Sequence, residues 1–316
     1  MTAMEQRSHK LSIAVATILL AAGSGVLAEE AAAPDTSAWA CKKCTFPQGY
    51  TSEAELGAGW LDDSSAKFGD YTGLDEDGVY VVANAEGGVA LESGYHLDYE
   101  LLDLGLDSRA ASIEGGKQGA YEFGLSYDRV PRRLSDTGET IFSGSVRAGS
   151  TAGMTALGTS LRPVDVGYDR DRYGANGRYF LGDKWTFGLD YKRDERSGTR
   201  PRYGSFGSVS TEMLRPIDDS TDRINADVRY QSKHWFAQLG YFASIYDTKA
   251  AGFQFDNPFN AAAPGGDAGR MSLEPDNLYN EVAVSLGWFG LPWNMAVTLS
   301  AAMGQGSQET GFNPYT

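Results

Sequence analysis

The chain has 316 residues, and 27 Lys and Arg stand against 42 Asp and Glu, which gives a formal net charge of −15. Such an acidic balance argues against a nucleic-acid partner, because nucleic-acid binding requires a basic patch. Three His and two Cys exclude a multi-His metal centre, a multihaem chain and a disulfide-stapled scaffold. Beyond the first residues no run of 18 apolar residues occurs, which excludes a helical membrane protein but not a β-barrel.

The first 28 residues have the features of a secretory signal peptide. Arg7 and Lys10 precede an apolar run from Leu11 to Ala22, and a small-residue stretch follows it. We therefore predict cleavage after Ala28 and export of the protein. A membrane anchor is the alternative, but the run is short for a span.

Residues 29–52 are expected to form a periplasmic tail, rich in Ala, Glu and Pro at its start, and residues 53–316 a β-sheet domain. In that domain apolar and polar residues alternate with a period of two, which is typical of strands. The segment Lys184 to Asp194 is a clear example, because Trp185, Phe187, Leu189 and Tyr191 alternate with polar or small residues. Phe236 and Phe242 break the pattern in their own segment.

The strands are long enough to cross a bilayer, since a membrane-spanning β-strand needs about 9–11 residues. Aromatic residues lie near the strand ends, as in the interfacial girdles of outer-membrane barrels. We predict an all-β, antiparallel transmembrane β-barrel of outer-membrane type. A soluble sandwich or solenoid is the alternative, and the strand length and the signal peptide argue against it. Eleven strands are predicted, over 53–62, 79–91, 95–105, 108–115, 118–130, 168–181, 184–197, 221–231, 235–247, 278–288 and 292–306.

The connections alternate between short turns and long segments over 63–78, 131–167, 198–220 and 248–277, with one tight exception at 106–108. In bacterial barrels the short side is periplasmic. An odd number of strands cannot close a single-chain bacterial barrel. We therefore expect an open, partial barrel with an unpaired edge at 293–304, and a natural gene that continues for several hundred residues.

One face of each strand should meet lipid and the other the lumen. Because the apolar residues of each strand must face lipid, the residues that alternate with them are predicted to face the lumen. These lumen-facing residues are Thr186, Gly188, Asp190, Ser285, Gly287, Ala296, Thr298, Ser300 and Ala302.

Cys41-Lys42-Lys43-Cys44 is the one compact reactive-looking motif. Haem attachment would need His after the second Cys, where Thr45 stands, and a zinc site would need a second ligand pair. Three interpretations stay open: a redox or assembly role, an inert local disulfide, and metal capture.

Acidic clusters such as Asp75-Glu76-Asp77 and Asp218-Asp219 are interpreted as solvated loop charge, with calcium binding as the alternative. Arg129, Arg132 and Arg133 are interpreted as mixed charge at strand ends or at the lumen rim. No catalytic or cofactor-binding constellation can be argued, so we expect no enzyme activity.

Several stretches resemble the MtrB/PioB family of decahaem-associated outer-membrane barrels. They are the Cys41/Cys44 pair, residues 103–109 (DLGLDSR), 114–119 (EGGKQG), 125–131 (LSYDRVP), 255–259 (FDNPF) and 314–316 (PYT). Family members are roughly twice as long as this chain.

The resemblance implies a large, non-enzymatic barrel that sheathes a periplasmic decahaem c-type cytochrome and lets it meet an extracellular multihaem cytochrome. Haem would then belong to the partner, and the barrel itself would bind no cofactor. The resemblance also associates the Cys pair with assembly. Extracellular electron transfer, in metal reduction or iron oxidation, is the expected process. A general substrate-diffusion porin is the alternative function.

Overall fold

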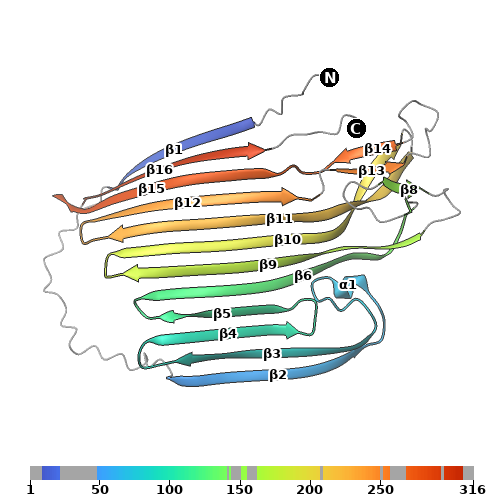
Figure 1. The fold of residues 1–316 in the computed structure, drawn as a ribbon, viewed down its shortest axis with the longest axis horizontal. Coiled ribbons are helices and arrows are strands. Elements are labelled where there is room, and N and C mark those ends of the chain that lie inside the picture. Colours follow the sequence, from blue (N-terminus) through green and yellow to red (C-terminus); the bar gives the residue numbers. More distant parts are fainter. Residues whose placement is uncertain are drawn as a thin grey trace.

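The computed structural model describes residues 9–21, 48–140, 142–143, 151–154, 162–206, 209–249, 252–256, 268–292 and 295–308. Its main feature is one twelve-stranded antiparallel sheet in the order β1-β16-β15-β12-β11-β10-β9-β6-β5-β4-β3-β2 (Figure 1). The strands of this sheet are β1 (His9–Ala21), β2 (Gly49–Leu61), β3 (Gly78–Ala90), β4 (Tyr95–Leu104), β5 (Ala110–Lys117), β6 (Tyr121–Thr140), β9 (Arg162–Leu181), β10 (Trp185–Phe206), β11 (Val209–Gln231), β12 (Trp235–Thr248), β15 (Asn277–Leu291) and β16 (Met295–Gln308).

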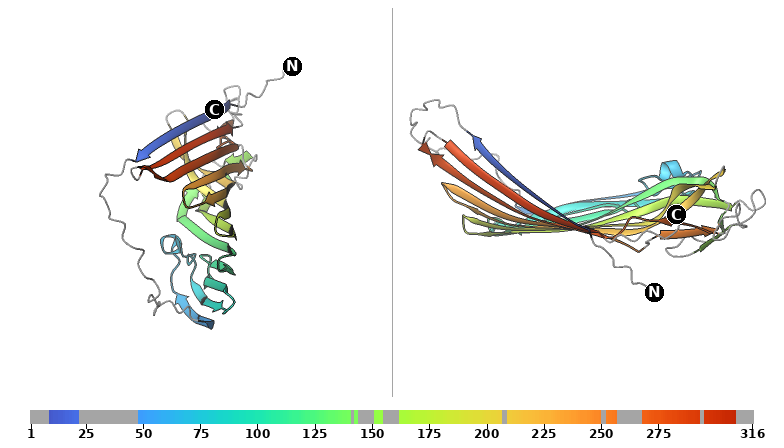
Figure 2. Two further views of the ribbon diagram at one scale, coloured as in Figure 1. Left: turned by 90° about the vertical axis from the view of Figure 1, so that its left-hand side faces the viewer. Right: turned by 90° about the horizontal axis from the view of Figure 1, so that it is seen from above.

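The sheet is open, as the sequence predicts. β2 to β6, β9 to β12, β15 and β16 are the eleven predicted strands, and β2 begins four residues before the expected start. Among the described residues β2 pairs only with β3, so the first and last of these eleven strands do not meet. Figure 2 shows the sheet bent into an arc rather than closed into a tube.

β1 occupies the edge that the sequence predicts to be unpaired. It runs antiparallel to β16 along its whole length, from His9 opposite Gln308 to Ala21 opposite Ala296. The edge of the sheet is therefore β1 and not β16. The unpaired backbone N–H and C=O groups of an edge strand such as β16 can pair with another extended segment, and β1 supplies it. β1 is also the core of the predicted signal peptide. That assignment stays a prediction, and cleavage after Ala28 would return the edge of β16 to its unpaired state.

Two of the predicted long connections are mostly strand, which corrects the sequence-based boundaries. β10 and β11 continue to Phe206 and from Val209, and they stay paired residue by residue over 185–206. β6 and β9 are extended in the same way, with register shifts between Arg133 and Gly138. Alternation is lost in these extensions because charged side chains lie on both faces, while the backbone ladder continues.

A small second sheet lies at the same end of the molecule, in the order β14-β13-β8-β7 (Figure 1). Its strands are β7 (Phe142–Ser143), β8 (Thr151–Met154), β13 (Gly252–Asp256) and β14 (Ala268–Ser272). The buried hydrophobic residues gather mainly at this end, which we call the long-loop end. They include Val166, Met213, Ile217, Phe253 and Phe255.

The connection between β2 and β3 contains the short helix α1 (Ala66–Gly69), whose N-terminus is capped by the side chain of Ser65. At the opposite end of the sheet, tight turns join neighbouring strands, and Gly94, Gly119 and Gly182 adopt positive φ values there. Within the described residues no helix is long and apolar enough to cross a membrane.

Candidate functional site: the polar face of the sheet

The register divides the sheet into two faces. Directly opposite residues of antiparallel strands project on the same side, so each row across the sheet belongs to one face. Across β10, β11, β12, β15 and β16, one row consists of the polar residues Thr186, Arg229, Gln238, Ser285 and Ser300. The neighbouring rows on the other side are apolar, for example Leu189, Ala226, Tyr241, Val282 and Met303. We call these the polar face and the apolar face.

The apolar face has the properties of a lipid-contacting band. Its large side chains are exposed, including Leu56 at 79% and Leu189 at 56%. An aromatic row lies at the short-turn end, where the rings of Trp185 and Tyr230 are 4.8 Å apart and those of Tyr230 and Trp235 are 4.5 Å apart.

On β9 and β12, charged residues interrupt the apolar face only further along the strand. On β9 the first is Asp171, so the stretch Tyr173 to Leu181 is free of charge on this face. On β12 the corresponding stretch runs from Trp235 to Ile245. Both match the length of about 9–11 residues that a membrane-spanning strand requires.

The polar face carries all nine residues predicted to line the lumen. Asp190 stands opposite Asn225, Gly188 opposite Asp227, and Ser285 opposite Ser300, with 3.1 Å between the two hydroxyl oxygens. The register shows that all nine residues lie on the same face of the sheet. That this face encloses a lumen stays a prediction. The nine are Thr186, Gly188, Asp190, Ser285, Gly287, Ala296, Thr298, Ser300 and Ala302.

Glycines on the polar face lie beneath larger side chains of the neighbouring strand. The ring of Phe236 lies over Gly287, and that of Tyr279 lies over Gly304. Phe242 packs beside Tyr279, with ring centroids 6.1 Å apart. The two phenylalanines that break the sequence alternation thus lie along the wall of the sheet and cover glycine or another ring.

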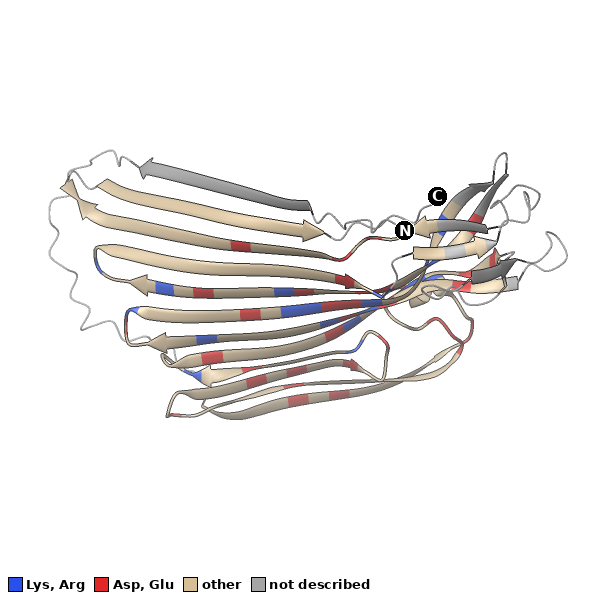
Figure 3. Cartoon of the chain, turned by 45° about the horizontal axis from the view of Figure 1, so that its top comes forward, with Lys and Arg blue, Asp and Glu red and all other residues tan. Residues whose placement is uncertain are grey.

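Charge is unevenly distributed over the polar face. Figure 3 shows acidic residues on β2 to β5 and basic residues concentrated on β9 to β11. On β2 to β5 the described polar face contains no Lys or Arg. Glu53 stands opposite Glu86, and Glu86 opposite Glu100, while Asp98 stands opposite Glu114. The carboxylates of this acidic wall are Glu53, Glu55, Glu86, Asp98, Glu100 and Glu114.

Seven basic residues of the polar face cluster on β9 to β11, at the edge of the lipid-contacting band and beyond it toward the long-loop end. We call them the arginine patch: Arg170, Arg172, Lys192, Arg196, Arg200, Arg215 and Arg223. Arg178 and Arg229 also lie on the polar face, but within the band. Four of them pair with carboxylates, as Arg196 does with Asp219 at 2.8 Å. The other three such pairs are Arg172–Asp128, Arg170–Asp194 and Arg215–Glu274.

Two hollows lie within the arginine patch. One of about 270 Å³ is lined by Arg196, Arg200 and Arg215 together with Asp219, Tyr246 and Glu274. Burial would raise the pKa of Glu274, but its own backbone N–H and the guanidinium of Arg215 outweigh burial and lower the pKa below its usual value. The other hollow, also of about 270 Å³, is lined by Arg170, Arg172, Lys192, Arg223 and neighbouring side chains.

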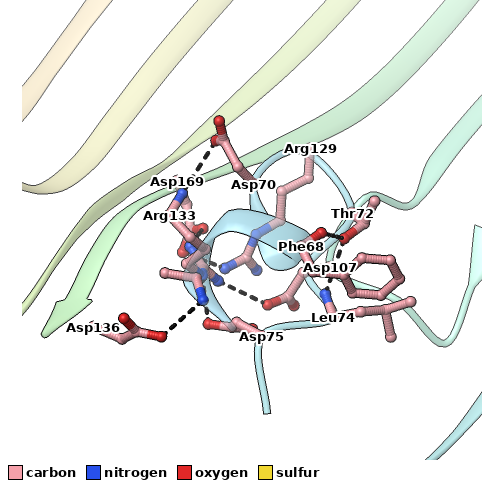
Figure 4. A network of polar contacts seen from close by, with 11 residues as sticks. Phe68, Asp70, Thr72, Leu74, Asp75, Asp107, Arg129, Arg133, Asp136 and Asp169 are labelled. Carbon is pink, nitrogen blue, oxygen red and sulfur yellow. Dashed lines mark hydrogen bonds and ion pairs between the residues drawn. The ribbon is translucent and has the colours of Figure 1, made fainter. Parts of the chain in front are cut away.

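A separate network fixes the β2–β3 connection at the long-loop end (Figure 4). Arg133 on β6 binds Asp75, Asp107 and Asp169, at 2.9, 3.1 and 2.8 Å, and Arg129 also binds Asp169, at 2.6 Å. Burial would raise the pKa of Asp169, but the hydrogen bonds from the two arginines dominate and lower it below its usual value.

This network also includes the tight turn at 106–108, because Arg133 donates a hydrogen bond to Asp107. Arg132 binds Asp70 at 2.8 Å and stacks over the ring of Tyr71.

The sequence-based interpretation of these charges as solvated is wrong for several of them. Asp219 is only 5% exposed in its ion pair with Arg196. Asp75, from another of these clusters, forms an ion pair with Arg133. These ion pairs could have been suspected from the sequence, because consecutive predicted strands are rich in both Arg and Asp. Which Arg pairs with which Asp depends on the strand register. Cys41 and Cys44 lie outside the described residues. Within the described residues, no group of three or more His, Cys, Asp or Glu side chains is arranged to hold a metal ion.

Comparison with known proteins agrees with this architecture. The family model described as "Putative outer membrane beta-barrel porin, MtrB/PioB" matches residues 60–316. The chain belongs to the MtrB/PioB family. Membership places it in the outer membrane as a barrel protein, which confirms the fold class and the localisation expected from the sequence.

A curated relative of this MtrB/PioB chain is the outer membrane protein MtrB of Shewanella baltica (strain OS185). It is 27% identical over 261 residues, which are 78% of this chain and 37% of the relative. The chain therefore spans little more than a third of that relative's length.

Solved outer-membrane protein structures resemble this chain with low TM-scores and low sequence identity. OmpT of Vibrio cholerae has a TM-score of 0.31 and 12% identity, over 82% of this chain and 76% of OmpT. The toluene transporter TbuX of Ralstonia pickettii has a TM-score of 0.24 and 9% identity, over 84% of this chain and 79% of TbuX.

Proposed function

We propose that this chain forms part of a non-enzymatic barrel wall that sheathes a periplasmic multihaem c-type cytochrome in the outer membrane. The barrel would hold the cytochrome where it can pass electrons to or from an extracellular multihaem cytochrome. The haems belong to the partners, and the barrel excludes water, ions and lipid from them. Metal reduction or iron oxidation at the cell surface is the process that such a conduit serves.

The polar face is the observation that carries this proposal. Small residues dominate the parts of it on β15 and β16, and the larger side chains of Phe236 and Tyr279 lie over Gly287 and Gly304. A wall of this kind lets a folded protein approach the backbone closely. Like charges that stand opposite one another, such as Glu86 and Glu100, are unfavourable in an empty wall and become favourable against a charged partner.

The family supports the same proposal, because the MtrB/PioB resemblance implies a decahaem cytochrome as the occupant. The Cys41/Cys44 pair is proposed to serve assembly rather than haem ligation. A double Cys→Ser variant should then lower the amount of barrel in the membrane under oxidative stress. Electron transfer per assembled complex should stay near normal.

Proteoliposomes test the function directly. The full-length barrel and its cytochrome are reconstituted around a reduced dye, with ferric iron outside. Dye oxidation is expected only when both proteins are present. The competing porin function predicts uptake of small sugars by liposomes that contain the barrel alone, with no dye oxidation when cytochrome is added. That result would overturn the sheath in favour of a diffusion porin.

A further inference from the structure

The arginine patch contains like charges that face one another across neighbouring strands. Arg170 stands opposite Arg196, and Arg200 stands opposite Arg215. Lys192 stands opposite Arg223. Directly opposed like charges destabilise a sheet, and here three such pairs lie on one face within two adjacent hairpin ladders.

Internal carboxylates balance only part of this charge. Among the described side chains, no ion pair joins Arg200 or Arg223 to a carboxylate, and both residues are exposed. Lys192 has only a long contact of 3.9 Å with Asp190. Arg200 stacks on the ring of Tyr168, 4.5 Å from its centroid, and donates to the tyrosine hydroxyl, which fixes the guanidinium without neutralising it.

The uncompensated cations lie at the two hollows. Arg200 lines one of them, and Lys192 and Arg223 line the other. A guanidinium held in place beside a concave surface is well suited to carboxylate oxygens, because its planar fork matches their geometry. The patch therefore has the chemistry of a carboxylate-binding surface.

We infer that the arginine patch docks acidic side chains of the protein that fills the barrel, an inference that rests on the proposed function. The acidic wall on β2 to β5 favours a protein over a free anion, because its six carboxylates repel small anions from the same interior. A protein with a basic side toward β2 to β5 and an acidic side toward β9 to β11 matches both regions. The patch also spans three strands and two hollows, a width that a protein surface reaches and a single small anion does not.

This division fixes the rotation of the occupant about the barrel axis. Its acidic surface lies against β9 to β11, at the long-loop edge of the lipid-contacting band and beyond it. By the usual arrangement of bacterial barrels, with short turns on the periplasmic side, that end is extracellular. The patch would then hold the cytochrome at the point where it leaves the membrane.

Charge reversal tests the inference in cells that produce the full-length barrel and its cytochrome. The variant carries Arg200→Glu and Arg223→Glu, and the control carries Lys184→Glu and Lys233→Glu. The control has the same change in net charge and alters exposed lysines in turns at the opposite end. After a wash with 0.3 M salt, we expect the variant to retain roughly tenfold less cytochrome per barrel, and the control to retain the wild-type amount.

Three results overturn the inference. Equal cytochrome retention by variant and control removes the role of the patch, while the sheath itself stands because the wild type still holds its cytochrome. A second result is that the variant retains cytochrome at the wild-type level, but its barrel without cytochrome loses anion-selective conductance. That result would assign the patch to a small anion. Absence of any cytochrome on the wild-type barrel removes the proposed function first, and the inference with it.

Zero-length carbodiimide cross-linking of the wild-type complex provides a second measurement, which does not require a charge-reversed variant to assemble. It joins Lys192 to a carboxylate that it contacts, and mass spectrometry identifies the product. A link between Lys192 and an Asp or Glu of the cytochrome supports the inference. Links from Lys192 to Asp190 alone, in complexes that contain the cytochrome, contradict it.

Discussion

Strand β10 passes through two environments, and the comparison between them explains much of the molecule. From Trp185 to Leu189 its apolar face presents large exposed side chains to lipid. From Arg193 onward the same strand carries charges on both faces, which pair with β9 and β11, as Arg193 does with Asp222 at 3.0 Å. The first part depends on lipid for its stability and the second on ion pairs and a small buried core. A sheet can therefore continue well beyond the membrane when its side-chain chemistry changes at the boundary.

The largest expected effect comes from placing a charge in the lipid-contacting band. Leu189→Arg puts a guanidinium on the apolar face, and should cost about 2–4 kcal/mol if it lies near the bilayer midplane. The amount of heat-modifiable barrel in outer-membrane fractions measures the loss. Thr298→Arg, on the polar face, is the control and should assemble normally. Equal loss for both variants would contradict the assignment of the two faces.

At the long-loop end, Arg133→Ala should affect a single segment rather than the whole barrel. The variant leaves Asp75, Asp107 and Asp169 without their shared partner, which should cost roughly 1–3 kcal/mol of local stability. Limited trypsin digestion should then cut after Lys67 on α1 while the strands stay protected.

Lys249→Ala is the comparison for that variant. Its partner is Asp218, and the Lys249 side chain is 74% exposed, so the change should cost less than about 1 kcal/mol. It should also leave digestion at Lys67 unchanged. Trypsin resistance at Lys67 in the Arg133→Ala protein would show that the network does not hold the loop.

The two regions also differ in how far the sequence predicts them. Within the lipid-contacting band the period-two pattern correctly predicts all eleven strands, because lipid imposes one apolar side chain at every second position. The pattern also predicts which residues lie on each face, for example Leu189 on the apolar face and Thr298 on the polar face. Beyond Arg193 the pattern disappears, since water and ion pairs accept charge on either face, and the predicted strand ends come too early.

The polar site is predictable only in part. The small and polar residues opposite the lipid-facing ones follow from alternation alone. The pairing of Arg133 with Asp75, Asp107 and Asp169 depends on three segments far apart in the sequence, so no local pattern specifies it. The opposed like charges of the arginine patch likewise depend on the register of β9 to β11.

A smaller effect is expected where an aromatic ring lies over a glycine of the polar face. Gly287→Ala would place a methyl group against the ring of Phe236, which should move or strain at a cost of about 1 kcal/mol. Gly240→Ala is matched to it, because the nearest atom to the added methyl is the Ala283 carbonyl oxygen at 3.9 Å, an ordinary contact. Thermal unfolding in detergent should separate the two variants, and identical midpoints would contradict the packing of Phe236.

The smallest expected effect is a loss of stability at low pH, confined to the long-loop end. Because the folded pKa of Asp169 lies below its usual value, its ion pairs stabilise the network fully above the ordinary pKa of about 3.9. This stabilisation is lost as the pH falls through the lower, folded pKa. Hydrogen–deuterium exchange of residues 62–77, corrected for the intrinsic pH dependence, should therefore rise below pH 4 and stay flat from about pH 5 to 7.

Asp169→Asn isolates this carboxylate from Asp75 and Asp107, which also contact Arg133. The variant keeps a side chain of the same shape but removes the charge that Arg129 and Arg133 share. Its exchange over residues 62–77 should be faster at neutral pH and less dependent on pH below 4. The Asp169→Asn change lies outside the lipid-contacting band, so the exchange of the band should be the same in the two proteins at each pH. An acid-dependent opening of equal size in the wild type and in Asp169→Asn would assign the pH dependence to the other carboxylates of the network.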